Sequence, residues 1–364
     1  MVRVAVAGVG VFGRNHLRVL RELETEGLGA ALVAAIEPDA KRAEETASHY
    51  AIPVFPTVDA MLAAGLRVDA ACVAVPTVQH HAVASVLLDS GIDLLVEKPL
   101  ATNLREADDL IRIQEKTGRI LQPGHLERFN PAVLAVEPRL KRPMFFEAHR
   151  LSVFTPRSLD VDVVLDLMIH DLDIVLTFAA SPIREVRAVG LPILSPKVDI
   201  ANVRVEFESG CVANFTASRV STERVRKLRF FEPRQYVSMD YARRDVLVIR
   251  VDSAANVPVG LAAALAGGKP DAVTLAKLAA GAGTGSAPGF RFIRPEITPG
   301  EPLRLEILSF LESVRTRRAP EVTPQQGRVA LELALEIQAT MVAHAHRAGL
   351  EDFFSADVGG PPAT

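Results

Sequence analysis

Short apolar runs alternate with amphipathic segments over the first 124 residues of the chain. The runs have the length and aliphatic composition of buried strands, and the segments between them repeat apolar residues at helical spacing. We predict strands at 2–7, 31–36, 69–75, 92–96 and 119–124, and helices at 14–28, 40–50, 80–90 and 103–116. This alternation is typical of an α/β fold with a doubly wound parallel sheet of the Rossmann type.

A different pattern begins at residue 125, where one strongly apolar helix is followed by many short strands. We predict strands near 185–189, 202–208, 212–217, 227–231, 237–240 and 246–251. They favour an α+β domain with a large open sheet over residues 125–322, interrupted by an Ala/Gly-rich excursion at 253–289.

Two amphipathic helices, 302–316 and 324–348, end the pattern. The second lies in a segment, 323–350, that is expected to pack back on the first domain, and residues 351–364 are expected to form a tail.

The apolar helix of the second half, residues 163–178, carries a polar stripe. Asp166, His170, Asp173 and Thr177 fall at helical spacing and share one face, whereas nearly all other positions are aliphatic. Burying an unpaired carboxylate or imidazolium is costly, so this face needs a ligand, a water-filled cleft or partners within the protein. A self-satisfied Asp/His pair inside a core is the alternative.

The composition narrows the range of functions. The chain has 364 residues, 49% of them hydrophobic and 23% charged, which is enough for two domains with a core each. A net charge of −3 without any basic block makes nucleic acid and an anionic membrane surface poor partners. No signal peptide and no apolar run of spanning length is visible, so a cytoplasmic protein is expected.

The two cysteines give no sign of a disulfide or of catalysis. Cys72 and Cys211 lie far apart, each inside a strand-like apolar run, as in reduced cytoplasmic proteins. No neighbouring histidine or basic helix end is apparent that would activate either thiol. We also expect no metal site, because His170 with Asp171 and Asp173 does not form a recognisable ligand set.

A strand, a glycine turn and a helix open the chain. Gly8, Gly10 and Gly13 directly follow the first strand, with Val11 and Phe12 between them. In this setting the first glycine permits a tight turn, the second lets a pyrophosphate approach the backbone, and the third lets the helix pack closely. An ordinary strand–helix turn is the alternative.

An acidic residue ends the second predicted strand. Glu37 is placed to accept hydrogen bonds from the adenosine ribose, which favours NAD over NADP as the cofactor. Lys41 and Arg42 follow closely and are placed to hold a 2′-phosphate instead, so we count Arg42 among the expected cofactor contacts.

Polar residues cluster where the later strands of the parallel sheet end. Ligands of such sheets bind outside the carboxyl ends of the strands, so these residues are candidates for cofactor or substrate contacts. A solvated surface side chain is the alternative for Lys98. The candidates are Pro76, Thr77 and His80 after one strand, Glu97 and Lys98 after the next, and His125, Arg128 and Asn130 after the last.

Together these motifs resemble the Gfo/Idh/MocA family, named after glucose-fructose oxidoreductase, inositol dehydrogenase and a rhizopine catabolism protein. The resemblance spans almost the whole chain. It rests on the glycine turn with Glu37, the Val75-Pro76-Thr77 edge with His80, the Glu97-Lys98-Pro99 segment, and Asp166 with His170. It implies a Rossmann domain, an α+β domain with an open, largely antiparallel sheet, tightly held NAD(P), and dehydrogenation of a pyranose or cyclitol.

Within the family, residues 124–131 and 160–171 resemble a nucleotide-sugar branch. That branch oxidises the 3-hydroxyl of UDP-N-acetylglucosamine and feeds a partner aminotransferase in 3-amino-sugar synthesis of the lipid A type. Lys98 matches the family's motif lysine, and Asp166 and His170 match its catalytic pair. The resemblance implies that His170 takes the hydroxyl proton while Asp166 orients its ring and Lys98 stabilises the alkoxide, although Lys98 is an alternative base.

Further contacts and alternatives complete the sequence-based hypothesis. Expected contacts to sugar or diphosphate are His125, Arg128, Asn130, Arg150 and Arg157, with a structural ion pair as the alternative for each arginine. Asp173 and Thr177 are expected to be structural. The open sheet is expected to form a homodimer or homotetramer. Alternative functions are a dehydrogenase of a free sugar, inositol or UDP-N-acetylglucosaminuronate, or a non-catalytic NAD-binding regulator.

Overall fold

The chain divides into two compact units. The computed structural model describes residues 1–154, 162–251 and 290–350. The first unit comprises Met1–Asn130, Leu172–Ile174 and Gly300–Ala339, and the second comprises Pro131–Asp171, Val175–Pro299 and Thr340–Thr364. Arg157, the excursion at 253–289 and the tail at 351–364 lie outside the described residues, so those expectations stay predictions.

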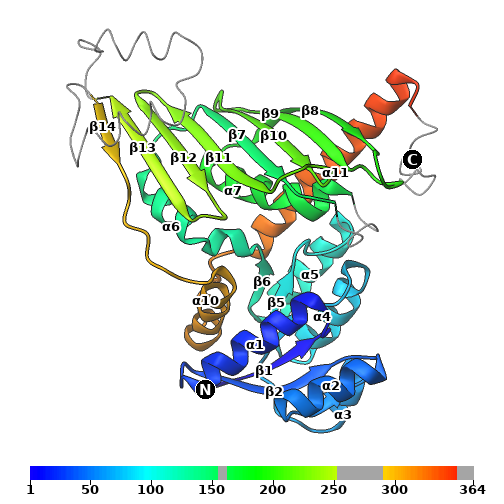
Figure 1. The fold of residues 1–364 in the computed structure, drawn as a ribbon. Coiled ribbons are helices and arrows are strands. Elements are labelled where there is room, and N and C mark those ends of the chain that lie inside the picture. The colour runs from blue at the N-terminus through cyan, green and yellow to red at the C-terminus, as the bar shows by residue number, and fades with distance from the viewer. Residues whose placement is uncertain (155–161, 252–289, 351–364) are drawn as a thin grey trace. The chain divides into compact units, whose positions relative to one another are not determined.

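The first unit contains a six-stranded parallel sheet (Figure 1). Its strands stand in the order β3-β2-β1-β4-β5-β6, with bounds β1 Val2–Ala7, β2 Ala30–Ile36, β3 Val54–Phe55, β4 Ala70–Val73, β5 Asp93–Glu97 and β6 Leu121–Gly124. Nearly every residue of β1, β2, β4 and β5 is buried, as expected when helices cover both faces of a parallel sheet. This confirms the predicted Rossmann-type fold.

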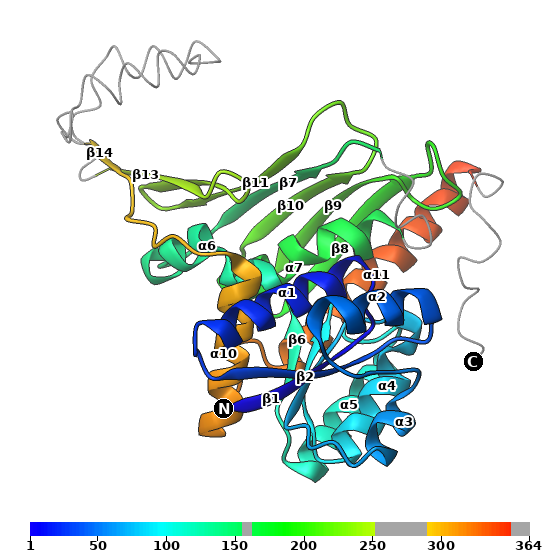
Figure 2. The same cartoon turned by 60° about the horizontal axis from the view of Figure 1, so that its bottom comes forward.

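The helices of the first unit cover that sheet (Figure 2). They are α1 Val11–Thr25, α2 Ala40–Tyr50, α3 Val58–Ala63, α4 His80–Asp89, α5 Leu104–Thr117 and α10 Pro302–Thr316, with the short turns η1 Thr77–Gln79 and η2 Leu126–Phe129. α10 packs against α1 and η2. The predicted helix bounds of α10 and of α11, Pro324–Ala348, are confirmed, whereas α1 begins three residues earlier than predicted, directly after Gly10.

The second unit contains an eight-stranded mixed sheet in the order β14-β13-β12-β11-β7-β10-β9-β8. The strands are β7 Phe145–Leu151, β8 Ile183–Leu191, β9 Ile200–Phe207, β10 Val212–Ser218, β11 Val225–Glu232, β12 Gln235–Asp240, β13 Asp245–Val251 and β14 Phe290–Ile293. Only the β7–β10 pairing is parallel among these described strands. This confirms the expected open, largely antiparallel sheet.

One face of this sheet is covered by α7, Ile169–Ala179, as Figures 1 and 2 both show. The alternation along the strands follows from this cover, because β9 turns Val203, Val205 and Phe207 to the buried face and Asn202 and Arg204 to the other. The short helices α6, Pro131–Val136, and η3, Glu137–Arg139, also belong to this unit.

The predicted stripe helix is not a regular α-helix at its start. A π-helical turn, η4 Val164–Met168, precedes α7, and the Ile169 N–H donates to the Val164 carbonyl five residues back. Asp162 caps this turn by accepting from the backbone N–H groups of Val164 and Leu165 at 2.9 and 3.0 Å. The expectation of a regular α-helix through Asp166 is therefore wrong, because the wider turn changes the angular step between residues.

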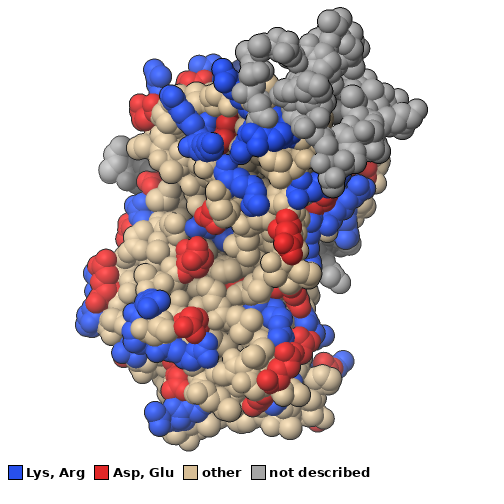
Figure 3. Space-filling view, turned by 90° about the vertical axis from the view of Figure 1, so that its left-hand side faces the viewer, with Lys and Arg blue, Asp and Glu red and all other residues tan. Residues whose placement is uncertain are grey.

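The described surface is mixed in charge. Figure 3 shows Lys and Arg side chains interspersed with Asp and Glu over the face in view, without a large region of one sign. Within the described ranges, every helix is too short or too polar to cross a lipid bilayer.

Candidate active site

The glycine turn between β1 and α1 has no room for a side chain at two of its three glycines. Gly8 has φ +86°, and a Cβ there would lie 2.7 Å from the Ala74 carbonyl oxygen. A Cβ on Gly13 would lie 1.8 Å from the Gly8 carbonyl oxygen, so the first turn of α1 packs against the loop itself. A Cβ on Gly10 would meet nothing within 4 Å. The turn thus leaves open space in front of the helix N-terminus, where a phosphate is favoured.

Glu37 lies at the end of β2 and is fixed by three hydrogen bonds. Its carboxylate accepts from the backbone N–H groups of Val9 at 3.1 Å and Asp39 at 3.0 Å, and from the Arg42 guanidinium at 2.8 Å. Burial opposes ionisation, but the Arg42 bond and the two backbone donors lower the pKa of Glu37. A carboxylate offers about four acceptor sites, so one remains for a ribose hydroxyl.

His80 has a structural place in the first unit. It is buried, and its ring nitrogens lie 2.9 Å from the Pro99 carbonyl oxygen and 3.0 Å from the Val75 carbonyl oxygen. Burial lowers the pKa of His80, against the two carbonyl groups that favour the protonated ring. The imidazole therefore ties the Lys98-Pro99 segment to the end of β4, and Pro76 and Thr77 lie beside it at the same edge. Direct contact of these three residues with the cofactor stays a prediction.

Glu97, at the end of β5, pairs with His16, which was not among the expected site residues. Its Oε1 lies 2.7 Å from His16 Nε2, and both side chains are buried. Burial opposes the charged ring, but Cys72 and Glu97 raise the pKa of His16 well above its usual range. Burial likewise opposes ionisation of Glu97, whereas the bond with His16 and the neighbouring Lys98 lower its pKa. The expectation that Cys72 has no histidine neighbour is therefore wrong.

The signal for His16 was present in the chain. It falls on the buried face of α1 together with Leu17 and Leu20, and a polar side chain on such a face needs a partner. Periodicity cannot name that partner, because Glu97 is 81 residues away.

The segment after β6 gathers several polar groups within the first unit. His125, Arg128 and Asn130 are all buried. Asp173 Oδ2 lies 3.6 Å from Arg128 Nε and 3.9 Å from His125 Nδ1, and Asn130 donates to Glu127 at 3.0 Å. Burial lowers the pKa of His125, with Arg128 and Lys98 acting in the same direction and Asp173 against them. Asp173 thus takes part in this cluster, and the substrate contacts expected of the other three stay predictions.

The second unit holds Asp166 in the π-helical turn and His170 in the first turn of α7, both half-buried. π-Helical turns are frequent at functional sites, which agrees with the role expected for this segment. Arg150 lies elsewhere in this unit, buried in a bidentate pair with Asp171 at 2.7 and 3.0 Å, and 5.2 Å from the Tyr241 ring centroid. The structural ion pair considered for Arg150 is therefore present.

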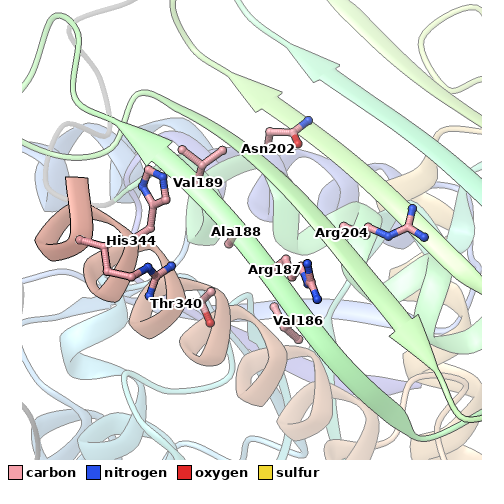
Figure 4. Close-up of a pocket in the computed structure, with 9 residues that line it drawn as sticks. Val186, Arg187, Ala188, Val189, Asn202, Arg204, Thr340 and His344 are labelled. Carbon is pink, nitrogen blue, oxygen red and sulfur yellow. The ribbon is translucent and has the colours of Figure 1, made fainter.

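A hollow of about 540 Å³ in the second unit holds none of the expected catalytic residues. It lies at the edge strand β8, where Figure 4 shows His344 and Thr340 projecting from α11 and Arg204 standing on the neighbouring strand. A smaller hollow of about 220 Å³ in the first unit is lined by Phe12, Asn15 and Glu97, among others. It lies at the glycine turn and is therefore the better match to the expected cofactor edge.

These observations fit a dinucleotide. The open space at Gly10 admits a pyrophosphate at the N-terminus of α1, and Glu37 retains an acceptor site for the adenosine ribose. Bound NAD would supply a hydride acceptor at its nicotinamide. Val11 and Phe12, more than half exposed at the start of α1, are available for contact with it.

Comparisons with known proteins agree with a dinucleotide site at the glycine turn. Residues 2–125 match the Gfo/Idh/MocA model described as an oxidoreductase family with an NAD-binding Rossmann fold, and residues 133–233 match the Gfo/Idh/MocA C-terminal domain. A UDP-N-acetylglucosamine 3-dehydrogenase of Acidithiobacillus ferrooxidans is 34% identical over 95% of this chain and 99% of its own. A solved structure of UDP-N-acetylglucosamine 3-dehydrogenase GnnA from the same species superposes with a TM-score of 0.79 at 32% identity, covering 94% of this chain and 97% of that one.

A more distant relative acts on a cyclitol. The scyllo-inositol 2-dehydrogenase (NAD(+)) of Bacillus subtilis is 28% identical over 60% of this chain and 68% of its own. With the two family models and a relative matched over almost its full length, the chain belongs to the Gfo/Idh/MocA family of oxidoreductases and is an NAD-dependent dehydrogenase.

Proposed function

We propose that this dehydrogenase oxidises the 3-hydroxyl of a UDP-linked N-acetylated hexosamine, UDP-N-acetylglucosamine, to the 3-keto sugar. The observation that carries the proposal is the 34% identity to a UDP-N-acetylglucosamine 3-dehydrogenase over almost the whole of both chains. The inositol relative, in contrast, matches over only 60% of this chain. A substrate assignment drawn from the full-length relative therefore takes both units into account.

The chemistry assigns a role to each expected catalytic residue. Oxidation breaks the C3–H bond, whose hydride reduces NAD, and the O–H bond, whose proton passes to a base. We assign the proton to His170, because an imidazole titrates near neutrality. Asp166 orients that ring and stabilises its charge, and Lys98 stabilises the alkoxide that develops on the oxygen. Lys98 is the alternative base.

The proposal extends to the cofactor, the next reaction and the substrate contacts. The charged Glu37 disfavours a 2′-phosphate, so NAD is preferred over NADP, although Arg42 softens that preference. The 3-keto product is a substrate for an aminotransferase, which would act next. His125, Arg128 and Asn130 are assigned to the sugar and its diphosphate.

The test is turnover with a defined set of substrates. Protein is mixed with NAD and UDP-N-acetylglucosamine, UDP-N-acetylglucosaminuronate, a free hexose or myo-inositol, with an amine present to trap the ketone, and NADH absorbance is followed. Of these four substrates, only UDP-N-acetylglucosamine is expected to be turned over. Turnover with free inositol or hexose and none with the nucleotide sugars refutes the substrate assignment.

The base is tested in the same assay. His170→Ala should lower kcat by about 100-fold or more with NAD affinity nearly unchanged. Lys98→Ala is the matched comparison, because normal turnover in His170→Ala with loss in Lys98→Ala would transfer the base role to the lysine.

A further inference from the structure

α10 places a carboxyl group in the hydrophobic core of the first unit. Glu306 lies one turn after Leu303 and one turn before Phe310, on the helix face that packs into the core, and its exposed fraction is 0%. The spacing along α10 calls for an aliphatic residue at this position. Burial of a charged carboxylate there would cost several kcal/mol.

Neither oxygen of Glu306 has a hydrogen-bond partner among the described residues. Other buried carboxylates of the same unit are well supplied. Asp93 accepts from the Ile120 backbone N–H and from the Arg317 guanidinium, and Glu97 is bonded to His16. A buried carboxyl without donors is stable only as the neutral acid.

The groups around Glu306 reinforce this. Glu97 on β5 and Asp173 on α7 are its acidic neighbours, and His16 on α1 is its basic neighbour. Burial is the largest cause that raises the pKa of Glu306 well above its usual range. The negative charges of Glu97 and Asp173 act in the same direction, and His16 acts against them.

The other charged residues on elements that pack against α10 have partners of their own. On η2, Glu127 contacts Asn130 and Arg128 contacts Asp173, and on β1 Arg3 contacts Asp69. On α1, Arg14 bonds to the Val9 carbonyl, Arg18 pairs with Glu22 and Arg21 with Glu24, and on β5 Asp93 pairs with Arg317.

The first turn of α10 also reaches the cofactor edge. Pro302 and Leu303 line the hollow of about 220 Å³ together with Phe12, Asn15 and Glu97. Glu306 therefore lies one helical turn after Leu303, which lines this hollow together with Glu97, the residue next to Lys98.

We propose that Glu306 is a positioning residue of the dehydrogenase site, which stays a neutral acid behind the Glu97–His16 pair and so adds no second negative charge behind Lys98. Two carboxyl groups in one poorly solvated space cannot both ionise at neutral pH, and one of them keeps a proton. Glu97, bonded to His16, is the ionised member. An ionised Glu306 would repel Glu97 and strengthen the hold of Lys98 on its proton, which would alter the residue that faces the developing alkoxide.

The first test needs no substrate. A carboxyl whose pKa is raised in the folded state stabilises fully below its unfolded pKa, and that stability is lost as the pH rises through the folded pKa. Glu306→Gln keeps the shape without the titration. Its Tm should therefore gain on that of the wild type as the pH rises from about 5 to about 8. A Tm difference that stays constant over this range overturns the proposal.

The second test observes the acid directly. Wild-type protein at neutral pH should show the infrared carbonyl stretch of a protonated carboxylic acid, and Glu306→Gln should lack it. The control Glu312→Gln, an exposed carboxylate on the same helix paired with Arg315, should keep the band. Absence of the band from the wild type refutes the neutral acid whether or not the variant folds.

The third test separates positioning from packing. The alkaline limb of kcat should move to lower pH in Glu306→Gln, because the variant lacks the negative charge that helps Lys98 to keep its proton in alkaline solution, while KM for NAD stays within about twofold. The control Ser313→Ala, a buried polar residue on α10, should leave the pH profile unchanged. An unshifted limb in Glu306→Gln would reduce Glu306 to a packing residue. The limb can be followed with any substrate the enzyme accepts, so it does not depend on UDP-N-acetylglucosamine.

Discussion

His16 Nε2 and Glu97 Oε1 lie 2.7 Å apart in the interior of the first unit. The pair connects α1, which begins at the glycine turn, with the end of β5, which leads into Lys98. Since the carboxyl end of β5 is where a parallel sheet binds its ligand, this bond fixes two parts of the cofactor edge relative to each other. A buried pair of this kind is costly to break from one side only, because the remaining group stays charged without a partner.

His16→Leu should therefore lower the free energy of unfolding by about 3–5 kcal/mol near pH 6. The raised pKa of His16 means that its stabilisation is complete below the unfolded pKa of about 6.5 and is lost as the pH rises through the folded pKa. The deficit of the variant should accordingly shrink in alkaline solution. Urea unfolding at several pH values measures this, with His49→Leu on the surface as the control. A deficit independent of pH contradicts the charged pair.

Gly10 and Gly13 should respond differently to alanine. Gly13→Ala forces a Cβ to 1.8 Å from the Gly8 carbonyl oxygen, so the Tm of the cofactor-free protein and the NAD affinity should both fall. Gly10→Ala meets nothing within 4 Å, so its Tm should match the wild type while NAD binding weakens by about tenfold or more, because the methyl group occupies the approach of the pyrophosphate. Calorimetric NAD titration and thermal unfolding measure the two effects. Unchanged NAD binding in Gly10→Ala would place the pyrophosphate elsewhere.

Glu37 should govern the choice of cofactor. Glu37→Ala removes an acceptor for the ribose hydroxyls, and a hydrogen bond to a charged group is worth about 1.5–3 kcal/mol, so NAD affinity should fall by about 10- to 100-fold. NADP affinity should stay level or rise, since Arg42 loses its carboxylate partner and becomes available to a 2′-phosphate. Glu45→Ala, on the exposed side of α2, is the control. Equal losses for both cofactors would show that Glu37 acts through the fold of the turn.

Features that depend on neighbouring residues in the chain could be predicted from the sequence, whereas features that depend on tertiary packing could not. The Rossmann sheet, the glycine turn and the bounds of α10 followed from periodicity and local spacing, because each depends on residues close together in the chain. The partner of His16 could not be predicted in this way, because the contact with Glu97 depends on how α1 packs on the sheet. Glu306 was missed for a related reason, since a charged residue in an amphipathic helix is normally assigned to the solvent side.

The π-helical turn at Val164–Met168 shows a second limit. Its residues are ordinary helix formers at the spacing of an α-helix, and the hydrogen bond from Ile169 to Val164 has no marker in the composition. The predicted face of Asp166 and His170 assumed a uniform step per residue. Asp166 and His170 could be chosen as candidates without that assumption, but the relative directions of their side chains depend on it.

Arg150 should act on stability. Arg150→Met leaves Asp171 charged and buried, which costs about 3–5 kcal/mol, and Arg150→Lys should recover only part of this, because an ammonium cannot form the bidentate bond. Arg150→Met combined with Asp171→Leu should be more stable than Arg150→Met alone. Urea unfolding of the three variants measures the effect. Normal stability with a raised KM for the nucleotide sugar would instead support the substrate contact expected from the sequence.

The outer face of the eight-stranded sheet should mediate self-association. Phe231 stands opposite Phe145 on one neighbouring strand and Tyr236 on the other, with ring centroids 5.5 and 5.1 Å away, and all three rings are half-exposed on the face opposite buried Phe146 and Phe230. A continuous aromatic row in water is unfavourable, and a second copy of the same row would cover it by two-fold symmetry.

Phe231→Glu should therefore reduce the particle mass in light scattering from a multiple of 39.2 kDa to 39.2 kDa. A carboxylate at the centre of a symmetric contact meets its own copy, and two like charges in an apolar interface are strongly repelled. Leu194→Glu is the matched control, because Leu194 is an equally apolar, 61% exposed residue of the same unit outside the sheet, and it should keep the wild-type mass. A wild type that is monomeric, or a Phe231→Glu variant that keeps the assembly, would exclude this face as the contact.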